Sequence, residues 1–135
     1  MITRLLNWLF SHRDIVNCDR DIYLSRWYLF RRESFAVFLH RFHRSDEDRA
    51  LHDHPWSFIT VILWRGYIEH TPQGSKRRWP GMICWRPAEW RHRVELVAKK
   101  PSWTLVIRLK ARREWGFWTQ SGWVQWNKWW QNNCE

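Results

Sequence analysis

The hydrophobic positions of the chain fall into short blocks of strand length. Residues 22–30 and 35–42 are rich in aromatic and aliphatic side chains, and the polar residues 31–34 separate them. Two such blocks joined by a short polar segment predict a β-hairpin. Residues 58–64 form a continuous apolar run that stops at Arg65–Gly66, which is typical of a buried strand. The first half of the chain therefore predicts β-structure.

The second half continues the series of short strands. A brief apolar run occupies residues 82–85, and a further strand is indicated at residues 104–110. Between them, residues 91–97 alternate between polar and apolar side chains, so a strand there would point His92 inward with Val94. Many short strands at this spacing predict an all-β sandwich or barrel.

Only the two ends of the chain have helical periodicity. Residues 2–10 contain a short apolar run that predicts an amphipathic helix docked on the domain, with a membrane-surface anchor as the alternative. Residues 121–131 are the second predicted helix. Its stripe at positions i, i+3, i+4 and i+7 consists of Trp123, Trp126, Asn127 and Trp130.

The chain predicts a single domain. The charged residues 44–49 indicate a solvated loop, and no linker or internal repeat interrupts the sequence. We therefore expect one domain over residues 1–135, with a barrel core at about residues 22–110 and a Trp-rich cap at residues 113–135.

Composition adds a basic charge and an unusual number of indoles. The 135 residues include 23 Lys or Arg and 13 Asp or Glu, which gives a formal net charge of +10 and favours anionic partners or substrates. Together with 14 Trp, this charge also fits a nucleic-acid-binding protein, in which cations follow phosphates and indoles stack on bases. That function is an alternative only, because the basic residues are spread along the chain. We interpret most Trp as packing residues of a small core and its cap.

The cysteines and the amino-terminal segment exclude several classes of protein. Cys18, Cys84 and Cys134 are odd in number, widely spaced and without a CxxC pair, which predicts neither a disulfide scaffold nor a four-Cys zinc site. The apolar run within residues 2–10 is too short for a signal peptide, and a membrane span needs about 20 apolar residues. We expect a cytoplasmic protein without a membrane span.

Three of the seven histidines are arranged as metal ligands. His52 and His54 lie two residues apart, and on a strand such residues project to the same side. With His92 from a later strand they would form a set of nitrogen ligands suited to Fe, Zn, Ni, Cu or Mn. The alternative is a set of hydrogen-bonded core imidazoles without metal. Asp53 should face away from this set. Surface or hairpin positions are expected for His40, His43, Glu69 and His70.

The residues around these histidines resemble the two motifs of the cupin superfamily over about residues 22–110. The first motif matches at His52, His54 and Gly66. The second matches at Gly81, Pro87 and His92. The resemblance implies a small all-β domain, the single double-stranded β-helix or jelly-roll barrel of cupins, here with short terminal helices. It also implies a metal at the barrel centre and allows a homodimer.

Four positions depart from the cupin motifs. Asp46 and Glu89 each stand in place of a Gly, and Leu96 stands in place of an Asn. The metal-binding Glu of the first motif falls at Phe58 or Ile59, neither of which can bind a metal. What the resemblance implies for this chain is therefore a three-His site.

A three-His cupin centre implies a metal-dependent enzyme acting on a small, anionic molecule. The metal implied is Fe(II), with Zn, Ni or Mn as alternatives, and the reaction class implied is oxygenase chemistry, with isomerase and hydrolase left open. Candidate substrate-binding residues are Arg108, Arg86 and Trp56, because an Arg can hold a carboxylate or phosphate through two hydrogen bonds. The main alternative function is a non-catalytic module that binds a sugar, nucleotide or peptide.

Overall fold

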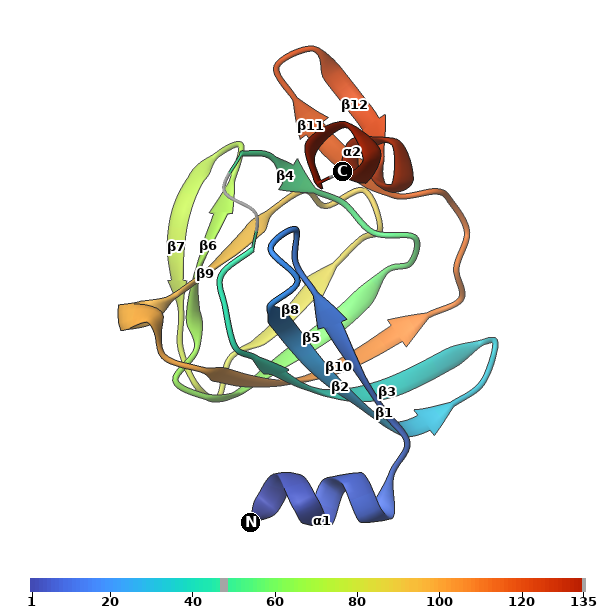
Figure 1. Cartoon of the computed structure of the whole chain (residues 1–135), viewed down its shortest axis with the longest axis vertical. Helices are drawn as coiled ribbons and strands as arrows, with labels where there is room; N and C mark the ends of the chain where they lie inside the picture. The colour runs from blue at the N-terminus through green and yellow to red at the C-terminus, as the bar shows by residue number, and fades with distance from the viewer. Residues whose placement is uncertain (47–48, 135) are drawn as a thin grey trace.

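The largest sheet of the protein is the six-stranded platform seen in the computed structural model, which describes residues 1–46 and 49–134 (Figure 1). Its strand order is β1-β2-β3-β10-β5-β8, and all neighbouring strands are antiparallel. The strands are β1 (His12–Val16), β2 (Ile22–Arg31), β3 (Phe35–Phe42), β10 (Ser102–Leu109), β5 (Phe58–Trp64) and β8 (Ile83–Arg86). The predicted hairpin of residues 22–30 and 35–42 is confirmed as β2 and β3.

Two three-stranded sheets complete the β-structure. One has the order β7-β6-β9, with β6 (Tyr67–Thr71), β7 (Gly74–Arg78) and β9 (Arg93–Leu96). The other has the order β12-β11-β4, with β4 (Leu51–His52), β11 (Gly116–Thr119) and β12 (Gly122–Gln125). A single 3₁₀ turn, η1 (Val97–Lys99), follows β9. The all-β class predicted from the sequence is confirmed.

The core lies on the inner face of the six-stranded sheet. One buried cluster consists of Ala36, Phe38, Phe58 and Val106, from three adjacent strands. A second cluster joins Ile62 of the large sheet to Tyr67 and Val94 of the β7-β6-β9 sheet. Contact between side chains of both sheets shows that the two sheets face each other around a shared interior. The predicted inward position of His92 beside Val94 is confirmed, since both are buried.

The amino-terminal helix α1 (Ile2–Leu9) forms where the sequence predicts one. Asn7 anchors it to the barrel, because the Asn7 Oδ1 accepts a hydrogen bond of 2.7 Å from the buried Trp27 Nε1. The apolar side chains on the rest of the helix remain exposed: Ile2, Leu5, Trp8 and Leu9. Among the described residues, no helix has the length and apolar character needed to cross a membrane.

The predicted helix over residues 121–131 is correct only in its second half, because α2 spans Trp126–Cys134. The preceding residues form β12 and pair with β11, with Trp118 opposite Trp123. Gly122 makes the tight hairpin between these strands possible, since its φ of +111° lies in the left-handed region that other residues avoid. We refer to β11, β12 and α2 together as the C-terminal cap, which lies over one end of the barrel (Figure 1).

A disulfide joins Cys18 to Cys134, across 116 positions of sequence, and Cys84 is buried with a free thiol. No disulfide scaffold is predicted from the sequence, and that prediction misses this single bridge. Pairing cannot be deduced from the positions of three distant cysteines, since it depends on the fold bringing two of them within reach. The bridge ties the end of α2 to the β1–β2 connection.

The interpretation of the tryptophans as packing residues is only half correct. Trp27 and Trp129 are buried, five more are half-buried, and seven of the 14 are exposed. Exposure is greatest for Trp8, at 81%. A small domain has too little interior for so many large indoles, so many of them lie at the surface.

Candidate metal centre

The three predicted histidines meet at the end of the barrel beneath the C-terminal cap. His52 ends β4, His54 follows two residues later, and His92 immediately precedes β9. His52 and His92 are joined by an antiparallel bridge in which each backbone amide donates to the other's carbonyl, at 2.9 and 3.0 Å. One ring nitrogen from each of the three side chains lies within 4.8 Å of the others. The ring centroids are 5.0 Å apart in all three pairs.

Burial keeps two of these imidazoles neutral. Burial is the main cause that lowers the pKa of His52 from 6.5 to about 4, with a smaller contribution from His92. Burial also lowers the pKa of His54 well below its usual value, helped by His92 and His52. A metal ligand must offer an unprotonated ring nitrogen, so His52 and His54 are in the form that binds metal at neutral pH.

The ring of His54 carries a nitrogen that the fold leaves unsatisfied. His54 Nδ1 is buried and has no hydrogen-bond partner among the described residues. The ring is packed against Trp56, which stacks on it at 5.7 Å, and against Phe58 at 4.5 Å. A buried polar atom without a partner costs about 1–3 kcal/mol. A metal ion bound to the imidazole set would offset that cost, so the residues present fit a metal.

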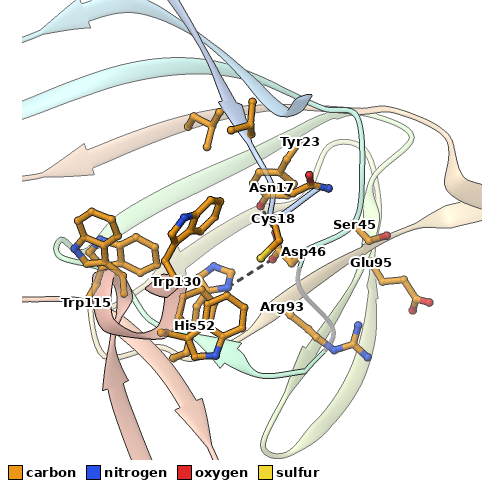
Figure 2. A pocket seen from close by; sticks show the side chains of 15 residues that line it. Asn17, Cys18, Tyr23, Ser45, Asp46, His52, Arg93, Glu95, Trp115 and Trp130 are labelled. Carbon is orange, nitrogen blue, oxygen red and sulfur yellow. Dashed lines mark hydrogen bonds and ion pairs between the residues drawn. The ribbon is translucent and has the colours of Figure 1, made fainter. Parts of the chain in front are cut away.

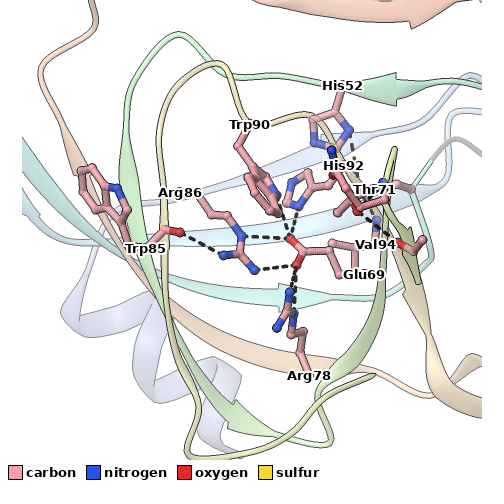
Figure 3. Close-up of polar contacts among 12 residues, drawn as sticks. His52, Glu69, Thr71, Arg78, Trp85, Arg86, Trp90, His92 and Val94 are labelled. Atoms are coloured by element: carbon pink, nitrogen blue, oxygen red, sulfur yellow. Dashed lines mark hydrogen bonds and ion pairs between the residues drawn. The ribbon is translucent and has the colours of Figure 1, made fainter. Parts of the chain in front are cut away.

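The carboxylate of Glu69 contacts the Nδ1 side of the His92 ring (Figure 3). Its Oε2 lies 2.6 Å from His92 Nδ1, which leaves the Nε2 of His92 as the nitrogen available for a metal. Glu69 is 1% exposed, and it also accepts hydrogen bonds from Arg86 Nη2 at 2.5 Å, Arg78 Nε at 2.9 Å and Trp90 Nε1 at 3.2 Å. The carboxylate is thus held by four side chains.

The pKa of Glu69 lies well below its usual range. Burial by itself raises this pKa, but hydrogen bonds from His92 and Arg86 outweigh the burial and lower it. Of the predicted surface or hairpin positions, the hairpin is correct, since Glu69 lies in the β6–β7 pair, but the surface is not, since the side chain is buried. The alternation along β6, with Tyr67 and Glu69 inward and Ile68 between them, is the sequence signal that places Glu69 in the interior.

The three predicted substrate-binding residues have different surroundings. Arg86 is buried, bonded to Glu69 and stacked on the ring of Trp90 at 4.4 Å. Arg108 donates to the carbonyls of Arg32 and Glu33, each at 3.0 Å. Trp56 is the one of the three that lies against the histidine group, through its stacking on His54.

Asp53 points away from the histidines, as predicted, and holds the C-terminal cap. It is 0% exposed and accepts four hydrogen bonds. Their donors are Gly116 N at 2.8 Å, Trp118 Nε1 and Trp123 Nε1 at 3.0 Å each, and Arg113 Nη2 at 3.2 Å. The residue between His52 and His54 therefore positions the segment that covers them.

The burial of Asp46 contradicts the solvated loop predicted at residues 44–49. Asp46 is buried, and its carboxylate accepts hydrogen bonds from the Tyr23 hydroxyl and from the Val94 amide. It also lies 3.7 Å from His52 Nδ1. Residues 47 and 48 of this predicted loop lie outside the described residues.

The remaining histidines lie outside the candidate metal centre. His40 lies in the β2–β3 hairpin, one of its two predicted positions, but it is buried rather than at the surface, and its Nε2 accepts a hydrogen bond of 2.9 Å from Arg26 Nε. His43 lies 2.8 Å from the Ser25 hydroxyl, and His70 pairs with Glu95 at 2.8 Å. Burial, followed by the charge of Arg26, lowers the pKa of His40 well below 6.5.

Metal-free protein is expected to lose stability in mild acid. In the folded state His40 and His52 have a lowered pKa, so below pH 6.5 the unfolded chain binds more protons than the folded one. The free energy of unfolding should then fall by about 1.4 kcal/mol per pH unit for each such histidine, and change little between pH 7 and pH 8. Urea unfolding from pH 8 to pH 5 measures this slope, which should be smaller in His40→Gln. Stability that rises on acidification would contradict the expectation.

Comparisons with known proteins identify the fold. No protein-family model and no curated protein matches the chain. Among solved structures, a cupin-2 domain from Rhodospirillum rubrum is similar with a TM-score of 0.66 and 12% identity, over 84% of this chain and 78% of that one. A sugar phosphate isomerase of the cupin superfamily from Silicibacter pomeroyi has a TM-score of 0.61 and 16% identity, over 87% and 88%. A structure described as FeII HppE has a TM-score of 0.59 and 13% identity, over 75% and 57%. The fold that the motifs imply is thus observed, and the chain has a cupin-like fold.

Proposed function

We propose that this protein is a cupin metalloenzyme in which His52, His54 and His92 hold a divalent transition metal, with Fe(II) and oxygenase-type chemistry as the specific assignment. The convergence of the three imidazoles within 4.8 Å carries the proposal. The neutral state of His52 and His54 and the unpartnered Nδ1 of His54 support it. The similar fold of the FeII HppE structure is consistent with iron.

When bound at this site, the metal would supply Lewis acidity and, as iron, electron transfer to O2. The chain's own residues prepare the site for that chemistry. Glu69 fixes the orientation and tautomer of His92, because its carboxylate accepts a hydrogen bond from Nδ1–H. Trp56 and Phe58 pack against His54 and exclude water from that side. Asp53 holds the cap over the opening.

Metal content tests the proposal directly. Protein purified without chelator is expected to contain about one equivalent of transition metal per chain, because one set of three nitrogen ligands is present. His92→Ala should lower metal content at least about tenfold, since it removes both a ligand and the partner of Glu69. His12→Ala is the matched control, because His12 is an exposed histidine in β1 and outside the site. Elemental analysis of all three proteins separates iron from Zn, Ni and Mn.

Oxygen consumption tests the specific assignment. Iron-loaded protein is expected to consume O2 in the presence of a substrate from panels of thiols and keto acids, and His92→Ala is not. Stoichiometric iron without O2 consumption on any panel would favour the non-catalytic binding module. If neither wild-type protein nor His12→Ala holds metal, the three histidines are structural and the enzyme proposal is wrong.

A further inference from the structure

A pocket of about 540 Å³ lies between the barrel and the C-terminal cap, and His52 forms part of its wall (Figure 2). Pockets of this size hold small organic molecules. The cap supplies an aromatic wall made of Trp115, Phe117, Trp126, Trp129 and Trp130. The barrel supplies polar groups, namely Asn17, Ser45, Asp46, Arg93 and Glu95. The pocket therefore suits a ligand with an apolar part and a polar part.

Two pairs of stacked rings order the aromatic wall, and the indole of Trp130 belongs to neither pair. Phe117 stacks on Trp129 with centroids 4.1 Å apart, and Trp115 stacks on Trp126 at 5.9 Å and 7°. Trp130 makes no ring contact within the part of the chain that the structure describes, although it is half-buried in the pocket. Its indole face is therefore available for stacking against a ligand.

The acidic groups of the polar wall are already engaged. Asp46 accepts hydrogen bonds from the Tyr23 hydroxyl and the Val94 amide. Glu95 pairs with His70 at 2.8 Å. These bonds occupy part of the acceptor capacity of both carboxylates, so fewer lone pairs are left for the hydroxyl groups of a ligand.

Arg93 is the charged group of the pocket that the fold leaves without a partner. Within residues 1–46 and 49–134, its guanidinium makes no ion pair and no hydrogen bond, although the side chain is half-buried. In Figure 2, Trp130 lies to the upper left of His52 and Arg93 to its lower right. A guanidinium binds a carboxylate through two parallel hydrogen bonds.

We propose that this pocket binds an aromatic carboxylate, whose ring stacks on Trp130 and whose carboxylate pairs with Arg93. The placement of this ligand at a metal centre rests on the proposed function, whereas its binding does not require the metal. The net charge of +10 also favours a negatively charged ligand. The phosphate of a sugar phosphate could also pair with Arg93. Its hydroxyl groups, however, would have to bond to the carboxylates of Asp46 and Glu95, which already accept hydrogen bonds within the protein.

Calorimetric titration of the protein, as purified, with naphthoate tests the proposal. We expect saturable binding of one naphthoate per chain, and binding of the neutral naphthalenemethanol at least about tenfold weaker, because the pair with Arg93 is lost. Arg93→Gln and Trp130→Ala should each weaken naphthoate binding by about tenfold or more. Lys76→Gln is the control, since it removes one exposed positive charge outside the pocket and should leave the affinity unchanged.

The remaining outcomes separate this proposal from the proposed function. Tighter binding of glucose phosphate than of naphthoate would overturn the aromatic class, and equal losses in Lys76→Gln and Arg93→Gln would overturn the role of Arg93. Failure of naphthoate to bind folded protein overturns the proposal even where metal is present. Naphthoate binding by metal-free protein supports the pocket and leaves the metalloenzyme proposal to the metal analysis. Thermal unfolding of each variant establishes that it is folded.

Discussion

Asp53→Ala is expected to lower the free energy of unfolding by about 3–5 kcal/mol, the usual cost of breaking a buried ion pair. The carboxylate is fully buried, and its loss leaves the Gly116 amide, two indole N–H groups and Arg113 without their acceptor. Because three of these donors belong to β11 and β12, the cap should loosen first. Urea unfolding followed by circular dichroism gives the total loss, and hydrogen exchange of the backbone amides of β11 and β12 reports the cap.

Two further variants define the cause. Asp53→Asn keeps the shape and one acceptor oxygen, so it should cost less than Asp53→Ala. Asp21→Ala removes an exposed carboxylate whose ion pair with Arg44 spans 3.2 Å, and surface pairs of this kind contribute about 0–1 kcal/mol. A loss in Asp53→Ala no larger than in Asp21→Ala would contradict the role assigned to Asp53.

Glu69→Ala is expected to have a similar effect on stability, about 3–5 kcal/mol, and a second effect on metal binding. Without Glu69, the guanidinium groups of Arg86 and Arg78 remain in the interior without a counter-ion. The ring of His92 also loses the acceptor that fixes its orientation, so metal affinity should fall by about 10–100-fold. Urea unfolding and competition with a fluorescent chelator measure the two effects separately.

The conservative variant separates positioning from structure. Glu69→Gln keeps the size and an oxygen acceptor but removes the charge, so it should recover part of the stability and leave metal binding weakened. Glu95→Gln provides the control, because Glu95 pairs with His70 at a half-exposed site on the neighbouring strand. Unchanged metal affinity in Glu69→Ala would show that Glu69 stabilises the barrel without positioning His92.

The grouping of His52, His54 and His92 could be predicted from sequence because their positions are set by local rules. His52 and His54 share a side through the two-residue repeat of an extended chain, and His92 follows the alternation that buries Val94. The strands β2, β3, β5, β8 and β10 of the large sheet were predictable from their apolar positions. The strand β1 was not, because none of its side chains is buried. The polar strand β7 (Gly74–Arg78) was not, because it lies at a sheet edge and carries charged side chains.

The supporting carboxylates depend on contacts between distant parts of the chain. Glu69 meets His92 across 23 positions, and Asp53 meets Trp123 across 70. Each contact joins segments that lie far apart in the sequence and that strand pairing within one sheet brings together, so spacing along one strand cannot indicate it. The search for the cupin Glu at Phe58 or Ile59 finds apolar residues, while a carboxylate reaches His92 from β6 instead.

The Cys18–Cys134 bridge changes how the cap can move. The cap is joined to the barrel at its start by the backbone that follows β10 and near its end by the disulfide, so both of its ends are held covalently. In a reducing compartment the covalent link at the end of α2 is absent, while the pairing of β11 with β4 and the hydrogen bonds of Asp53 still hold the start of the cap. The freedom of α2 to move away from the pocket therefore depends on the redox state of the surroundings.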